Sequence, residues 1–233
     1  MPLTFPIHLF NPSGIKAGLV GRAVQSPPSI SGIGQSLRSD GGGYWVVQYS
    51  GITLNTADKL RAWRAWESEL DGGATRVIAP VPDLFLAPRP LAGSSLAAPS
   101  GLVSTSDDPY FPEAIGFASP FIVATAGAAD LRATQVTITV AQGSRAKGGQ
   151  LFAIDHPDAG RRLYQIGRVL SQSGQTATVT IRCPLRQAIA ADTPVDFNWP
   201  GVESVMMLDN DITADIQIGK YATDMSITFR EAI

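Results

Sequence analysis

Cysteine is nearly absent from this sequence. Cys183 is the only one among 233 residues, so no disulfide can form within the chain, and a structural zinc site built on several cysteines is excluded. A single thiol is typical of a protein made in a reducing cytoplasm. Histidine is almost as scarce, because the chain has only His8 and His156.

Charged residues are also few. They make up 16% of the chain, against 44% hydrophobic residues, and the formal net charge is -2. No segment concentrates Lys and Arg, which argues against binding of nucleic acid through its phosphates. The first residues lack the basic start and apolar run of a signal peptide, and no apolar run reaches membrane-spanning length. We therefore expect a soluble, non-exported protein with no nucleic-acid or membrane partner.

Glycine and proline are abundant, with 23 and 17 residues, and this composition favours strands and loops over helical bundles. Short runs that alternate apolar and polar residues predict strands in the first 55 residues and again after residue 134. The later runs end in Gly-rich turns and predict a small barrel or sandwich. The clearest expected strands are 43–54, 75–79, 135–140, 151–154, 163–166, 177–182, 204–208, 214–218 and 225–230.

One helix is predicted between residues 56 and 70. Thr56 is a good N-cap residue, and apolar side chains follow at near-helical spacing up to Leu70. Gly72 and Gly73 then allow a left-handed stop. In the simplest interpretation Trp63 and Trp66 fill the interface between this helix and a sheet. The alternative is that the two tryptophans stack on a ligand.

Residues 80–120 are rich in Pro, Ser, Ala and Gly and show almost no periodicity. A long segment of this kind in a compact domain is explained by disorder, by a linker role, or by packing on a neighbouring subunit. We favour the third explanation and predict that this arm contributes to a subunit interface.

A search for reactive constellations yields no catalytic, cofactor or metal site. His156 lies in a turn-like sequence, 155–160, and is expected to be a solvated loop residue, as is His8. Asp209 and Asp211 resemble the start of a calcium loop, but position twelve is Lys220 instead of Glu.

Two other groups are expected to be structural. Ser94 and Ser95 lack the turn of a hydrolase nucleophile. The glycines between 14 and 43 are interpreted as hairpin turns and bulges because no phosphate-binding motif follows them.

A set of short segments in the C-terminal half forms a recognisable pattern: 127–133, 148–154, 162–166, 181–188 and 229–232. With these segments, residues 127–233 resemble minor tail proteins of long-tailed phages and prophages, in particular the distal tail protein. The N-terminal half is similar to the same class through its Gly-rich hairpin, aromatic strand, single helix, and the loop at 106–112 that follows 80–83.

The resemblance implies a mainly β chain with one helix and two domains. A β-sandwich-like ring, or belt, domain would comprise residues 1–120 and 203–233. An inserted OB-fold or galectin-like β-barrel domain would comprise residues 121–202.

The function implied is structural, not enzymatic. The protein would form a ring, commonly a hexamer, at the distal end of the tail tube in the virion. It would be assembled in the bacterial host cytoplasm as part of the tail tip or baseplate. Its partners would be further copies of itself, the tail tube protein, the hub or tip proteins and tail fibres.

Two other functions remain open from the sequence. In the first, the second domain is a carbohydrate-binding module that uses Tyr164 or Trp199 to stack on a host glycan. In the second, the chain forms a ring elsewhere in the tail, such as the tube, terminator or hub. An enzyme is disfavoured because no paired carboxylates or histidine-centred site can be recognised.

Overall fold

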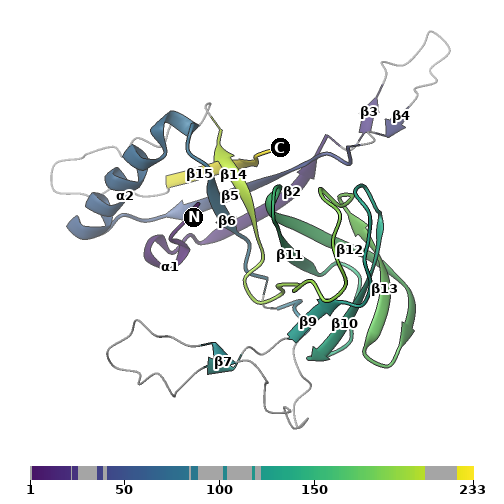
Figure 1. Cartoon of the computed structure of the whole chain (residues 1–233). Helices are drawn as coiled ribbons and strands as arrows, with labels where there is room; N and C mark the ends of the chain where they lie inside the picture. The colour runs from purple at the N-terminus through teal and green to yellow at the C-terminus, as the bar shows by residue number, and fades with distance from the viewer. Residues whose placement is uncertain are drawn as a thin grey trace. The chain divides into compact units, whose positions relative to one another are not determined.

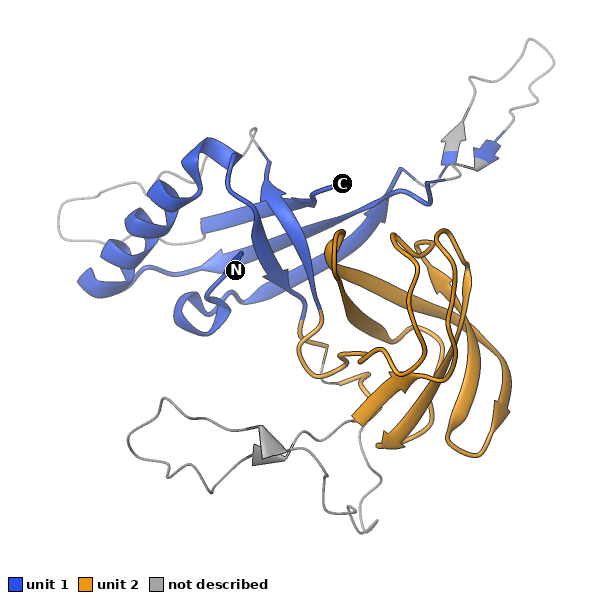
Figure 2. Ribbon diagram, in the orientation of Figure 1, with its two compact units in different colours: residues 1–81, 201–233 blue, residues 82–200 orange. Residues whose placement is uncertain are grey.

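The computed structural model describes residues 2–21, 23–25, 36–38, 41–83, 85–88, 102–103, 117–118, 122–207 and 225–233. The chain is mainly β with one main helix (Figure 1). It divides into two compact units, Met1–Val81 with Gly201–Ile233 and Pro82–Pro200 (Figure 2). The first boundary was expected at residue 120, which lies outside the described residues, and the first change of unit falls between 81 and 82. The second boundary was expected at 203, and the change of unit falls between 200 and 201.

The first unit is built on a six-stranded sheet in the order β1-β6-β14-β15-β5-β2. All neighbours are antiparallel except β1 and β6. These strands are β1 (Leu3–Thr4), β2 (Gly14–Val20), β5 (Tyr44–Ile52), β6 (Val77–Pro80), β14 (Gly201–Met206) and β15 (Met225–Glu231).

The predicted helix is confirmed as α2 (Ala57–Glu69). The Thr56 side chain accepts a hydrogen bond from the Lys59 amide, and Gly72 and Gly73 beyond the helix have positive φ. Trp63 and Trp66 are buried at 0% and 8% exposure, as the simplest interpretation of the sequence required.

An aromatic cluster forms the core beneath α2. Phe5 stacks on Tyr49 of β5 at 4.3 Å between ring centroids, and its ring meets that of Trp66 at 5.8 Å. Phe10, at the end of the short helix α1 (Ile7–Phe10), meets Trp63 edge to face at 5.0 Å. Removing a buried aromatic of this kind typically costs ~3–5 kcal/mol, so α2 is held by tertiary packing as well as by its cap.

The second unit is a five-stranded antiparallel sheet in the order β11-β12-β13-β10-β9 that curls into a half-barrel. Along β10 and β13, apolar side chains alternate into the interior while threonines face outward. The strands are β9 (Ile122–Thr125), β10 (Gln135–Gln142), β11 (Leu151–His156), β12 (Gly160–Ser173) and β13 (Thr176–Arg182). The four runs predicted between 135 and 182 are therefore all strands.

The segment 193–196 joins the two edge strands of this half-barrel. The Val195 amide donates to the carbonyl of Val123 on β9, and the Asp196 and Ala153 backbones exchange two hydrogen bonds on the side of β11. A continuous circuit of backbone pairing therefore runs around the unit. Nothing in the alternation of the sequence predicted this closure.

Several expected features lie wholly or partly outside the described residues. They are the strand at 214–218, the loop at 106–112, Ser94 and Ser95, the Asp209 to Lys220 segment, and most of the arm at 80–120. Within the arm the structure describes a pairing of β7 (Leu102–Val103) with β8 (Phe117–Ala118).

Candidate functional site

The longest free edge of the six-stranded sheet belongs to β2. This strand pairs with β5 on one side and has no strand partner on the other among the described residues. Its Ile15 and Val20 side chains are 38% and 46% exposed. Unpaired N–H and C=O groups on such an edge can accept a strand from another chain. The edge of β2 is thus suited to association.

The antiparallel pair β2–β5 continues beyond the six-stranded sheet as a two-stranded ribbon. Between β2 and β5 in the chain, β3 (Ala23–Gln25) pairs with β4 (Ser36–Arg38). Figure 1 shows this ribbon projecting away from the six-stranded sheet. Leu37 on β4 is 69% exposed. A two-stranded ribbon alone is only marginally stable, so this ribbon would gain from packing on another surface.

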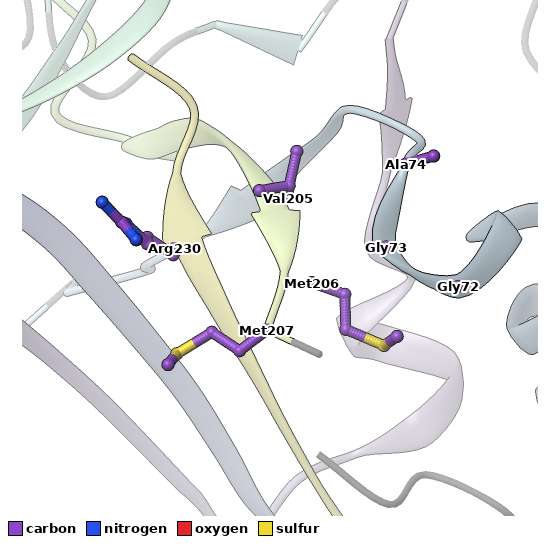
Figure 3. Close-up of a pocket in the computed structure, with 7 residues that line it drawn as sticks. All are labelled: Gly72, Gly73, Ala74, Val205, Met206, Met207 and Arg230. Carbon is purple, nitrogen blue, oxygen red and sulfur yellow. The ribbon is translucent and has the colours of Figure 1, made fainter. Parts of the chain in front are cut away.

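The first unit also contains an apolar pocket of about 560 Å³, which we call the Met206 pocket. Gly72, Gly73 and Ala74 face the end of β14 across it (Figure 3). The pocket lies where β14 extends beyond the first residue of β6. The last β14–β6 pair is Ser204 with Val77, and β14 continues to Met206. Its remaining lining residues are Val205, Met206, Met207 and Arg230.

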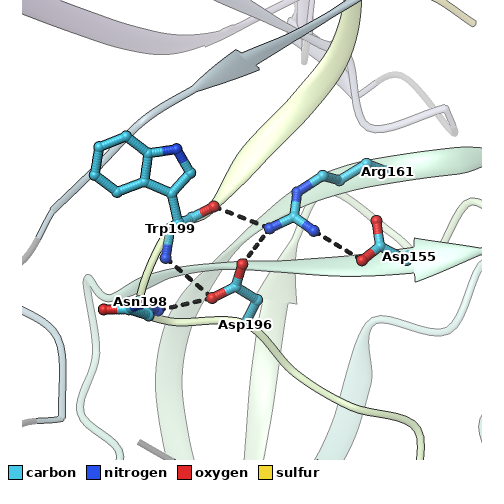
Figure 4. A network of polar contacts seen from close by, with 5 residues as sticks. All are labelled: Asp155, Arg161, Asp196, Asn198 and Trp199. Atoms are coloured by element: carbon cyan, nitrogen blue, oxygen red, sulfur yellow. Dashed lines mark hydrogen bonds and ion pairs between the residues drawn. The ribbon is translucent and has the colours of Figure 1, made fainter. Parts of the chain in front are cut away.

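In the second unit, Arg161 fixes the turn that follows the closing segment (Figure 4). Its Nη1 donates to Asp155 Oδ2 at 2.7 Å, and its Nη2 donates to Asp196 Oδ2 and to the Trp199 carbonyl, the latter at 2.9 Å. The other Asp196 oxygen accepts the amides of Asn198 and Trp199 at 2.8 and 3.0 Å. Because both Asp196 oxygens and Arg161 Nη2 are used to hold the turn, we assign the network a structural role.

The prediction that His156 is a solvated loop residue is wrong. His156 ends β11, is only 5% exposed, and shares a 2.8 Å hydrogen bond between its Nε2 and the Tyr164 hydroxyl. Burial, helped by the positive charge of Arg162 and opposed by Asp155, lowers its pKa to about 4. The turn-like sequence suggested a loop position, but the turn begins only after His156, whose side chain faces the interior. His8, by contrast, is exposed, on α1.

The tryptophan and tyrosine candidates for ligand stacking differ in accessibility. Tyr164 is fully buried and accepts the Arg186 amide at 3.1 Å, so it cannot stack on a glycan. Trp63 is likewise fully buried, and the Trp66 ring packs on Phe5, which overturns a ligand-stacking role for the pair. Only Trp199, at 39% exposure, presents part of its indole ring to solvent.

Two further arginines lie beside the residues described above. Arg162, next to Arg161, is 5% exposed, and the backbone amide of Arg186 donates to the Tyr164 hydroxyl. Across the described part of the chain, no cluster of His, Cys, Asp and Glu has the geometry of a metal site. The same residues contain no helix long and apolar enough to cross a membrane.

Sequence reasoning did not find the Met206 pocket or the free edge of β2. The pocket depends on where β6 begins relative to the end of β14, and the edge depends on strand order, so neither leaves a local signal in the sequence. No protein-family model matches the chain, and no curated protein shows significant similarity to it.

Proposed function

We propose that this protein is a structural component of a phage tail or phage-derived tail, a distal tail protein whose copies form a ring, commonly a hexamer, at the end of the tail tube. The observation that carries the proposal is the hairpin of the first unit, with its free β2 edge, its projecting ribbon and the exposed Leu37. Edge pairing between copies supplies a head-to-tail contact, and head-to-tail contacts generate rings when the rotation closes.

The resemblance of the sequence to distal tail proteins supports the same proposal. In this proposal the six-stranded unit is the ring-forming belt domain, and the second unit is an OB-fold or galectin-like barrel carried by it. The curled five-stranded sheet with its linking segment at 193–196 supports a barrel of that kind. The ring would seat the hub or tip proteins below the tail tube and position tail fibres.

The test is the mass of the purified protein by light scattering, followed by negative-stain imaging. We expect a closed ring with a central channel and a mass that is a small multiple of the 24.6 kDa chain. A monomer that persists at high concentration would overturn the proposal. A ring that binds tail tube subunits at neither face would instead point to another ring position in the tail.

A second candidate function is glycan binding by the barrel unit. The exposed indole of Trp199, on a turn held by Asp196 and Arg161, favours it, because sugars bind aromatic faces held rigidly at a surface. Screening on a glycan array tests this candidate. Binding that is lost in Trp199→Ala and kept in Leu170→Ala, a variant at another exposed apolar side chain, would support it.

A further inference from the structure

The described residues 85–88 of the second unit expose an aromatic side chain to solvent. Phe85 is 93% exposed and Leu86 is 47% exposed, the former being the most exposed large apolar side chain in the described part of the molecule. Scattered exposed apolar residues are ordinary on protein surfaces. Here two neighbours form one apolar projection, which we call the Phe85 knob.

Four hydrogen bonds hold Asp83 and the backbone of residues 86–88. Asp83 accepts the Leu86 amide through Oδ1 at 3.3 Å and the Ala87 amide through its carbonyl at 3.1 Å. The Leu86 carbonyl accepts the Gln150 side-chain amide at 2.6 Å, and the Pro88 carbonyl accepts the Ser144 amide at 2.8 Å. A projection fixed in this way loses little conformational entropy when a partner buries it, which is the property of an interface anchor.

The Met206 pocket has the complementary chemistry. Its lining is mostly apolar, its two glycines have no side chain to fill it, and methionine adapts its shape to an inserted ring. A pocket of about 560 Å³ accepts an aromatic and an aliphatic side chain together. The knob and the pocket lie on different units of the chain, Phe85 in Pro82–Pro200 and the pocket in the other.

The Met206 pocket and the Phe85 knob carry opposite charges, at Arg230 and Asp83. Among the described residues that line the pocket, Arg230 is the charged one, and its guanidinium lies over the Tyr44 ring at 4.2 Å. A stacked guanidinium keeps its edge available for a carboxylate. The knob carries such a carboxylate, since Asp83 begins its turn and uses only Oδ1 in the turn bond described above.

We propose that the Phe85 knob of one copy enters the Met206 pocket of a second copy, with Asp83 of the first copy pairing with Arg230 of the second. Knob and pocket are different surfaces, so the contact is head-to-tail and continues from copy to copy until it closes. The inference rests on the proposed ring and names a specific contact within it.

Site-directed crosslinking tests the contact in the full chain. Phe85→Cys and Met207→Cys are made separately, mixed, and treated with a short bis-maleimide; Cys183 is 1% exposed and stays in place as a buried thiol. We expect covalent dimers only in the mixture. A mixture of Leu170→Cys with Met207→Cys is the matched control and should give none.

The double variant Phe85→Cys with Met207→Cys distinguishes contacts between copies from a contact within one. A ladder of covalent multimers supports the proposal. A crosslinked product at monomer mass shows that the knob fills the pocket of its own copy, and absence of any product shows that they do not meet. Either of these two results overturns the proposal.

Assembly measurements separate this inference from the proposed function. Phe85→Ala, Asp83→Lys and Arg230→Glu should each raise the concentration of half-assembly at least about tenfold, and the Asp83→Lys, Arg230→Glu double variant should recover part of the loss. Leu170→Ala should change nothing. If the natural chain forms rings and these variants form them equally well, the knob–pocket contact is wrong but the proposed ring is supported. If the natural chain is monomeric, both the contact and the proposed ring are wrong.

Discussion

At the residue scale, the buried side chains of the second unit show how environment overrides local sequence. The motif around His156 is that of a turn, yet the imidazole is buried in the half-barrel against the Tyr164 hydroxyl. Since the Arg186 amide donates to that same hydroxyl oxygen, the hydroxyl hydrogen is available to His156 Nε2. The arrangement therefore stabilises the neutral imidazole.

The lowered pKa of His156 predicts acid sensitivity. The unfolded chain binds a proton at this histidine below pH ~6.5, whereas the folded protein does so only below about 4. Between these values the unfolded state binds more protons, so stability is full above pH ~6.5 and falls as the pH drops through the window. The loss from this residue is at most about 3 kcal/mol.

Urea unfolding at pH 7.5 and 4.5 measures this effect. His156→Gln should reduce the difference between the two free energies of unfolding, because glutamine does not titrate. His8→Gln, at an exposed histidine, is the control and should leave the difference unchanged. An equal pH dependence in His156→Gln would show that other groups cause the acid sensitivity.

Arg161 offers a second prediction at this scale. Arg161→Ala removes the donors to Asp155, Asp196 and the Trp199 carbonyl and should lower the free energy of unfolding by about 1–3 kcal/mol. Arg168→Ala, at an exposed position on β12, should cost under ~0.5 kcal/mol. Equal costs for the two variants would contradict the structural role assigned to the network.

At the scale of elements, the β3–β4 ribbon is the part of the first unit that is not paired with the six-stranded sheet. Because Leu37 is 69% exposed, Leu37→Lys should leave the unfolding of the single chain unchanged. It should weaken assembly if the ribbon packs on a neighbouring copy, since a lysine charge is costly in an apolar contact.

Sedimentation velocity over a concentration series, with thermal unfolding alongside, checks the ribbon prediction. Leu170→Lys, which adds the same charge at an exposed apolar side chain of the second unit, is the control for altered surface charge. Assembly that is identical in Leu37→Lys and the natural chain would remove the ribbon from the interface.

At the scale of the whole molecule, the chain leaves and re-enters the first unit at adjacent positions. Pro80 at the end of β6 is paired directly with Gly201 at the start of β14. A short connection can therefore replace everything between them. We predict that exchanging residues 82–200 for a short Gly/Ser turn leaves the six-stranded unit folded, because its aromatic core lies entirely outside that segment.

Circular dichroism and near-ultraviolet signals from Trp63 and Trp66 test the excision. Cooperative thermal unfolding with retained tryptophan signals is the expected result. A chain that is unfolded, or that loses the near-ultraviolet signal, would show that the first unit depends on the second.

The sequence by itself determined the features that depend on near neighbours. The N-cap at Thr56, the helix that follows it, its stop at Gly72 and Gly73, and the alternation along β10 and β13 all arise from backbone and side-chain preferences over a few residues. These preferences are enough to predict a mainly β chain with one helix.

Only the tertiary structure decided which residues are buried and which surfaces remain open. The burial of His156, the pairing of residues 193–196 with both edges of the half-barrel, the Met206 pocket and the exposure of Phe85 each depend on segments far apart in the chain. The physical reason is that strand order and strand ends are set by packing between distant segments, and local preferences do not encode them.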